Sequence, residues 1–266
     1  MFKKVLSIIL ILITVSLMGV NGLSVKDNRY TEPADTQKGI EFLDKLSSQS
    51  IEEAEKSIKK IEDEYNAVYL AAQTEKNVKK SIRRLNAGKT TLRKIFKNVT
   101  FAGDSLMAGL EAYDILNSKR IFAQVSASLY HLEENIPLIV KQNPKILVLH
   151  YGINMIATDE VYLDIFVKMY TRLIKDLKKQ LPDTRIIVSL IFPVDRKIAK
   201  AARFGRISAY NKATIKMCKK LKVEYINSSS VLNAHPECYG SDGIHQSQAF
   251  YDKHWLKFLM REKGIY

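Results

Sequence analysis

The chain has 266 residues, of which 46% are hydrophobic, so it can bury a sizeable core and is not a disordered protein. Its 42 basic and 28 acidic residues give a net charge of +14, which favours an anionic partner such as a wall polymer or a membrane surface. Solvated surface charge without a specific partner explains the same balance and is the favoured interpretation. No helix-turn-helix, zinc-finger or RNA-binding motif is present, and we expect no nucleic-acid partner.

Residues 1–22 have the pattern of a signal peptide. Lys3 and Lys4 precede an uncharged apolar run from Val5 to Val20, and small residues follow. This run is shorter than the ~20 residues that a membrane-spanning helix needs. An uncleaved N-terminal membrane anchor is the alternative, because no clear cleavage site follows. Both interpretations predict an extracytoplasmic protein, either secreted or anchored.

Residues 23–37 are polar and are predicted to form a linker, and residues 38–97 are predicted to be a helical segment. Ser50 and Glu53 have the spacing of a capping box at a helix start. The apolar residues that follow recur at intervals of three and four, as on one face of a helix: Ile51, Ala54, Ile58, Ile61, Tyr65, Val68 and Ala72. This face either packs on the rest of the protein or belongs to a dimerising or spacer helix, so the oligomeric state stays open. A second, basic helix is predicted over about Val78–Lys97.

Residues 98–266 alternate between short apolar runs and longer amphipathic segments. Strands are predicted at Val99–Ala102, Ile121–Val125, Ile146–His150, Arg185–Phe192 and Glu224–Ile226. Helices are predicted at Leu106–Leu116, Leu132–Gln142, Val161–Gln180, Arg206–Leu221 and Gln248–Lys263. Such alternation predicts an α/β domain with three αβα layers, in which right-handed crossovers join the parallel strands. The functional site of such a sheet lies beyond the carboxyl ends of its strands.

Two short motifs directly follow predicted strands. The Gly-Asp-Ser sequence at residues 103–105 permits a tight turn that places Ser105 at a helix N-terminus, where its backbone N–H is free to bind an oxyanion. In the Gly-Ile-Asn sequence at residues 152–154, Asn154 can direct its side-chain N–H at a developing negative oxygen. Taken singly, these motifs also fit a helix cap and an ordinary loop turn.

A third motif lies in a late loop, before the last predicted helix. Asp242 precedes His245 by three positions, so its carboxylate can orient the imidazole towards a nucleophile. A capped helix start with a solvated histidine is the alternative for this motif alone. Together the three motifs supply the nucleophile, the oxyanion donor and the oriented base that acyl transfer requires.

The combination resembles the SGNH (GDSL-like) hydrolase superfamily over about residues 98–263. The resemblance implies a flavodoxin-like fold with a five-stranded parallel sheet in the order 2-1-3-4-5. It implies that Ser105 is the nucleophile, His245 the base and Asp242 its partner. It also implies an oxyanion hole that includes the Ser105 backbone N–H and Asn154.

Two positions depart from the pattern of that superfamily. The family's second block supplies a glycine N–H to the oxyanion hole, but residues 125–128 are Val-Ser-Ala-Ser. Ser126 or Ala127 is expected to replace this donor, and we assign Ala127. Met155 stands where the third block usually has Asp, which affects the loop's shape more than its chemistry. Similar departures occur in branches that modify extracellular polysaccharides and peptidoglycan.

The leading interpretation is therefore an exported serine esterase that removes O-acyl groups, in particular O-acetyl, from wall or extracellular polysaccharide. It needs no cofactor and no metal. His150 and Tyr151 are predicted to contact the substrate, with a buried, hydrogen-bonded His150 as the alternative. An O-acetyltransferase with the same triad, a non-catalytic wall-binding protein and a lipase are the other functions considered.

The remaining histidines and the cysteines show no metal-ligand spacing, and no structural zinc is predicted. His131, His235 and His254 receive no role. Cys218 and Cys238 are expected to form either one disulfide or two free thiols.

Overall fold

The computed structural model describes residues 34–47 and 51–266, and the chain divides into two compact units, which meet between Asn66 and Ala67. The predicted signal segment, most of the predicted linker and Ser50 of the capping box lie outside the described residues. Within the described ranges, no helix is both long enough and apolar enough to cross a membrane.

In the part of the chain that the structure describes, three helices precede the first strand. Helix α2 spans Ala34–Ser47 and so begins before the predicted end of the linker. Helix α3 is a single helix, Ile51–Asn86, in place of the two predicted helices, because neither Gly nor Pro interrupts this stretch. It is followed by Gly88, whose φ of +67° favours glycine. The short helix α4, Leu92–Ile95, starts at the N-cap Thr91.

The apolar face predicted for α3 is largely exposed. Ile51, Tyr65 and Val68 are 73%, 68% and 70% exposed. Later in the same helix, Val78 and Ile82 are buried and belong to the hydrophobic core of the second unit. Val78 and Ile82, which pack in the core of the second unit, lie C-terminal to the predicted face. The boundary between the two compact units falls inside this helix.

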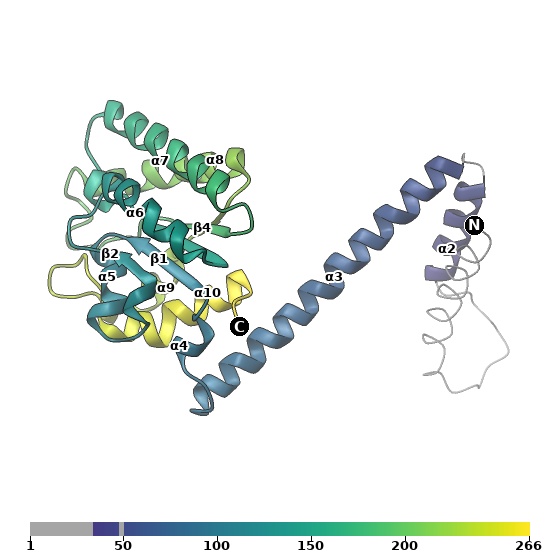
Figure 1. The fold of residues 1–266 in the computed structure, drawn as a ribbon, viewed down its shortest axis with the longest axis horizontal. Coiled ribbons are helices and arrows are strands. Elements are labelled where there is room, and N and C mark those ends of the chain that lie inside the picture. The colour runs from purple at the N-terminus through teal and green to yellow at the C-terminus, as the bar shows by residue number, and fades with distance from the viewer. Residues whose placement is uncertain (1–33, 48–50) are drawn as a thin grey trace. The chain divides into compact units, whose positions relative to one another are not determined.

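The second unit contains a three-layer αβα arrangement built on a parallel five-stranded sheet, as predicted. The strand order is β2-β1-β3-β4-β5, which is the order that the resemblance implied. Helices cover both faces of the sheet (Figure 1). The strands are β1 Val99–Gly103, β2 Ile121–Ala123, β3 Ile146–His150, β4 Arg185–Ser189 and β5 Glu224–Ile226. Leu147, Val148 and Leu149 of the central β3 are fully buried, because both faces of this strand are covered.

The helices of this unit follow the predicted positions, with two differences. Their bounds are α5 Ser105–Ala112, α6 Leu129–Gln142, α7 Glu160–Gln180, α8 Ile207–Leu221, α9 Ser229–Ala234 and α10 Leu256–Lys263. Helix α9 is absent from the predicted elements, because one and a half turns are too short to show a period. The last predicted helix begins as a π-helix, η5 Phe250–Trp255, and Trp255 is buried in the core.

The two cysteines are buried free thiols, which decides between the two states expected from the sequence. Cys218 lies in α8, and Cys238 in the short 3₁₀ helix η4, Pro236–Cys238. Burial raises the pKa of the Cys218 thiol to about 12, so this group stays protonated and unreactive at neutral pH.

Candidate active site

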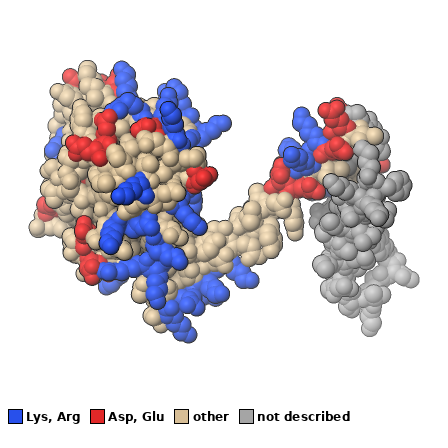
Figure 2. Space-filling view, in the orientation of Figure 1, with Lys and Arg blue, Asp and Glu red and all other residues tan. Residues whose placement is uncertain are grey.

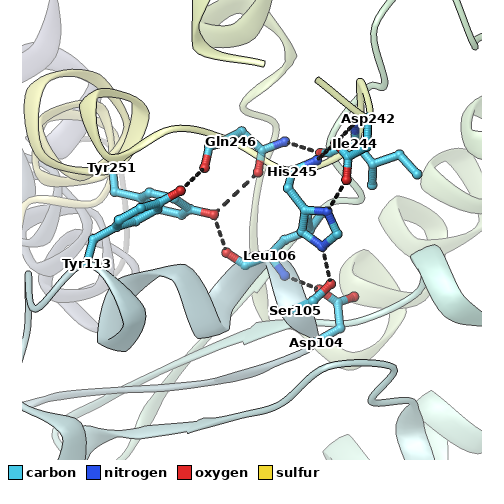
Figure 3. Close-up of polar contacts among 9 residues, drawn as sticks. All are labelled: Asp104, Ser105, Leu106, Tyr113, Asp242, Ile244, His245, Gln246 and Tyr251. Carbon is cyan, nitrogen blue, oxygen red and sulfur yellow. Dashed lines mark hydrogen bonds and ion pairs between the residues drawn. The ribbon is translucent and has the colours of Figure 1, made fainter. Parts of the chain in front are cut away.

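The structure brings together the three residues predicted as a triad (Figure 3). Ser105 opens α5 directly after β1, and the loop that precedes η5 carries Asp242 and His245. The His245 Nε2 lies 2.8 Å from the Ser105 Oγ, and its Nδ1 lies 2.5 Å from the Asp242 Oδ2. This chain of contacts connects a nucleophile to a general base, and the base to an orienting carboxylate.

Asp242 is held in its ionised form by its own loop. Its Oδ1 accepts hydrogen bonds from the backbone N–H groups of Ile244 and His245, at 2.9 and 3.0 Å. Burial alone would raise the pKa of Asp242, but the hydrogen bonds from the His245 ring and from these N–H groups outweigh it and lower the pKa to about 2. The carboxylate can therefore fix the imidazole tautomer and stabilise the imidazolium that forms during catalysis.

Backbone contacts hold the catalytic loop, which we define as residues 239–247, in place. The Gly240 N–H donates to the His245 carbonyl at 2.7 Å, and the Asp195 N–H donates to the Gly243 carbonyl at 2.8 Å. Gly243 has a φ of +68°, and a Cβ added there would lie 3.0 Å from the Asp195 Cβ. The turn that separates Asp242 from His245 therefore requires glycine.

Residues that the sequence did not single out join the catalytic loop to the helix of the nucleophile (Figure 3). The Tyr251 hydroxyl donates to the Leu106 carbonyl at 2.6 Å and lies 3.4 Å from the Gln246 Oε1. The Tyr113 hydroxyl donates to the Gln246 carbonyl at 3.1 Å. Gln246 itself is 2% exposed. These contacts fix α5 relative to the loop and so hold the distance between nucleophile and base.

The predicted oxyanion hole needs one correction. Asn154, in the 3₁₀ helix η2 Ile153–Met155, donates from its Nδ2 to the Ala127 carbonyl at 3.0 Å, which joins two of the loops concerned. Ala127 is 1% exposed, and its N–H already donates to the Gln124 carbonyl at 3.3 Å. Ser126 is exposed and has a φ of +60°, a conformation that favours glycine. The geometry therefore favours Ser126 over Ala127 as the donor that replaces the glycine.

His150 and Tyr151 lie beneath the site and not on its surface. His150 is fully buried and Tyr151 is 2% exposed, which contradicts the predicted substrate contacts. The His150 Nδ1 lies 3.1 Å from the Ser189 Oγ, and its ring packs against Phe192. Burial lowers the pKa of His150 to about 3, so the ring is neutral. The alternative, a buried and hydrogen-bonded histidine, describes this residue.

Asp104 is a structural residue beside the nucleophile. It is fully buried, and its Oδ1 accepts a hydrogen bond from the Leu106 N–H at 3.0 Å, which caps α5. Burial raises the pKa of Asp104 to about 7, against the opposing effect of backbone N–H groups that bond to the carboxylate.

Asp104→Asn should make stability less dependent on pH. Because the pKa of Asp104 is 3.8 in its ordinary state and about 7 in the fold, the native protein binds more protons than the unfolded chain between these values. The contribution of Asp104 to the free energy of unfolding therefore falls as pH rises through this window, by up to roughly 4 kcal/mol. Asparagine keeps the capping oxygen but cannot ionise. Thermal unfolding at about pH 5 and pH 8 checks this, and parallel profiles for the two proteins would contradict it.

One group outside the triad has the chemistry of a metal site. Within residues 34–47 and 51–266, His235, Glu237 and His254 are brought close enough together to share an ion. The sequence did not suggest this, since the two histidines are far apart in the chain.

Comparison with known proteins finds one matching family and several similar solved structures. A profile of the GDSL-like Lipase/Acylhydrolase family matches residues 101–253. A protein classed as a GDSL-like lipase from Parabacteroides merdae is 15% identical with a TM-score of 0.50, over 62% of this chain and 94% of its own. A GDSL-like lipase from Bacteroides thetaiotaomicron is 17% identical (TM-score 0.48, 71% and 97% covered). A catalytic mutant of an acetylxylan esterase from Geobacillus stearothermophilus is 16% identical (TM-score 0.46, 61% and 92% covered). No curated protein matches the chain.

Proposed function

The chain belongs to the GDSL-like lipase/acylhydrolase family of serine hydrolases, and we propose that it removes O-acyl groups, in particular O-acetyl, from an extracellular or wall polysaccharide. The proposal rests mainly on the contact of the His245 Nε2 with the Ser105 Oγ at 2.8 Å. The Nδ1 on the other side of the ring contacts the ionised carboxylate of Asp242. The apolar run in residues 1–22 supports an extracytoplasmic location, either secreted or anchored.

The geometry supports a two-step reaction. As the Ser105 Oγ attacks the ester carbonyl, the His245 Nε2 takes its proton, and Asp242 stabilises the imidazolium. In this proposal the Ser105 N–H, the second N–H of the Asn154 side chain and the Ser126 N–H stabilise the tetrahedral oxyanion. The sugar hydroxyl leaves with the proton from the imidazolium, and water activated by the same imidazole then hydrolyses the acyl-enzyme.

O-acetyl transfer is the second candidate, since a sugar hydroxyl can replace water in the last step. The side chains of His245 and Asp242 are 49% and 47% exposed, so the site is open both to a bulky acceptor and to bulk water. Because water is in large excess at an open site, we favour hydrolysis.

Acetate release from O-acetylated polysaccharides tests the proposal, with and without an added sugar acceptor. Free acetate in amounts that the acceptor does not lower would support the esterase. Acetylated acceptor formed at the expense of acetate would favour the transferase. Hydrolysis of p-nitrophenyl acetate without acetate release from any polysaccharide would contradict the proposed substrate while leaving the serine mechanism intact.

Positive charge is concentrated in residues 76–97, which we call the basic segment. Figure 2 shows Lys and Arg crowded over α4 and the adjacent end of α3. The segment contains no acidic residue, and its exposed cations are Lys76, Lys79, Lys80, Arg83, Arg84, Lys89, Arg93, Lys94 and Lys97. The cations of α3 surround the positions of Val78 and Ile82, which the core buries, so the helix presents its charge to solvent.

The basic segment leads to the amino end of β1, whereas the triad lies at the carboxyl ends of the strands. Lys97 stands just before Val99, where β1 begins, whereas Ser105 follows the end of that strand. A polymer bound to the segment would therefore not hold the ester that is cleaved. We propose that the segment retains the enzyme on an anionic wall polymer.

Neutralising part of the basic segment should weaken binding to an anionic polymer without lowering esterase activity. The variant replaces Lys76, Lys80, Arg83 and Lys94 with Gln. Each cation that faces an anionic surface contributes about 1 kcal/mol at low salt, so the four changes together should lower the affinity for immobilised polyanion by up to roughly a thousandfold. Hydrolysis of p-nitrophenyl acetate should stay unchanged.

A control variant with the same loss of charge separates a local site from net charge. It replaces the exposed Lys168, Lys175, Lys212 and Lys216 of helices α7 and α8 with Gln. Equal weakening in both variants would show that net charge alone drives retention and would contradict the proposed role of the segment.

A further inference from the structure

Two histidines and a glutamate lie close together, on the segments that precede and follow the catalytic loop. His235 follows α9, Glu237 lies in η4, and His254 lies in the π-helix η5. The potential ligand atoms of these three residues all lie within 4.8 Å of one another. The His235 Nδ1 is 3.1 Å from the Glu237 Oε1, and the His235 and His254 rings stack with their centroids 3.6 Å apart.

We propose that His235, Glu237 and His254 bind a zinc ion that ties together the two segments flanking the catalytic loop. Neutral imidazole nitrogen and carboxylate oxygen are preferred zinc ligands, at distances of about 2.0–2.2 Å. Tetrahedral coordination would bring the three ligand atoms to roughly 3.3 Å from one another, with water at the fourth position. His235 and His254 are partly exposed and Glu237 is exposed, so their side chains have room to rotate towards a shared ion.

The backbones that carry these side chains are already fixed. The Cys238 N–H donates to the His235 carbonyl at 3.0 Å, which holds the turn of η4. Trp255, next to His254, donates from its Nε1 to the Ser228 Oγ at 3.0 Å in the core. The ion would thus add a cross-link between two positions that folding has already brought together, at little cost in backbone entropy.

The donor set suits a transition-metal ion. Two imidazoles and one carboxylate are ligands that zinc prefers, whereas Mg²⁺ prefers oxygen ligands alone. Lys253 stands next to His254 in the chain, and its positive charge further disfavours weakly held ions such as Mg²⁺.

The site is separate from the triad, and its effect would be on the stability of the loop. Beyond Cys238, the chain pairs back on itself through the Ser247 N–H, which donates to the Cys238 carbonyl at 2.8 Å, and through a bridge between Tyr239 and Gln246. A zinc clip at His235 and His254 would hold the chain on either side of this pairing. It would therefore restrict opening of the loop that positions Asp242 and His245.

Thermal unfolding of the metal-free full chain, with and without ZnCl₂, tests the proposal. Zinc at ~100 times its Kd should raise Tm by roughly 5 °C or more, whereas MgCl₂ should have no effect. His254→Gln and Glu237→Gln should lose or reduce the shift, each measured against its own metal-free baseline. His131→Gln, which changes a histidine at the start of α6, should keep it.

Elemental analysis after dialysis gives a second measurement that does not depend on how stable each variant is. One zinc per chain in the unchanged protein and in His131→Gln, and none in His254→Gln, is the expected result. No shift and no retained zinc would overturn the proposal. A shift or retained zinc that survives in His254→Gln would also overturn it, since the ion would then bind elsewhere, for example between His245 and Asp242.

Discussion

Ser105→Ala should abolish ester hydrolysis, lowering kcat for p-nitrophenyl acetate on the order of 10⁶-fold. The Ser105 Oγ is the group that His245 can deprotonate, at 2.8 Å, and alanine leaves the base with nothing to activate for attack. The oxyanion donors stay in place, so a small residual rate above that in buffer is expected. Release of p-nitrophenol over time measures both.

A matched serine variant controls for general damage. Ser118 is exposed in the short helix η1, Ser118–Arg120, and Ser118→Ala should keep full activity. Thermal unfolding of Ser105→Ala should show an intact fold. If Ser105→Ala kept activity comparable with that of Ser118→Ala, the serine mechanism would be wrong, and with it the esterase function.

Asp242→Asn should lower kcat by roughly 10⁴-fold while changing KM little. The Asp242 carboxylate, ionised with a pKa of about 2, lies 2.5 Å from the His245 Nδ1. Asparagine cannot stabilise the imidazolium, and its amide can favour the tautomer with the proton on Nε2, which cannot accept the serine proton. Steady-state kinetics with p-nitrophenyl acetate gives kcat and KM separately.

Two further proteins make the test of Asp242 decisive. Asp183→Asn, at an exposed position before β4, removes a carboxylate far from the triad and should leave kcat unchanged. The double variant Ser105→Ala with Asp242→Asn should be no slower than Ser105→Ala alone, because residues that act as a unit have non-additive effects. Additive losses would mean that Asp242 contributes through another step.

The triad could be predicted from the sequence because each of its residues lies in a short, recognisable motif. Ser105 stands directly after an apolar run, and the spacing of Asp242 and His245 lets one loop orient both. The strand positions could be predicted for a similar reason, since β3 is a continuous apolar run bounded by polar residues. The order of the strands in the sheet rests on the family resemblance instead, because an apolar run does not encode which strand lies beside it.

Features that depend on distant contacts could not be predicted. Nothing near Gln246 indicates that Tyr113, 133 positions away, donates a hydrogen bond to it. The choice between Ser126 and Ala127 depends on backbone dihedrals and on which N–H is already engaged. His150 looks like a site residue because it ends a strand at the active edge, but a ring in that place can point into the core as well as out of it.

Val78 and Ile82 are part of the folded core although they lie outside the stretch that matches the family. The family match begins at residue 101, yet these two side chains lie in the same core, and a Cβ on Gly264 would meet Thr74 of α3 at 2.6 Å. A chain trimmed to the matched region would expose the apolar surface that they cover, at about 1.5–3 kcal/mol for each. The family match, residues 101–253, and the folded unit, which begins at Ala67, therefore cover different stretches of the chain. Exchange of N-terminal parts between relatives would preserve the fold only when the junction lies upstream of this end of α3.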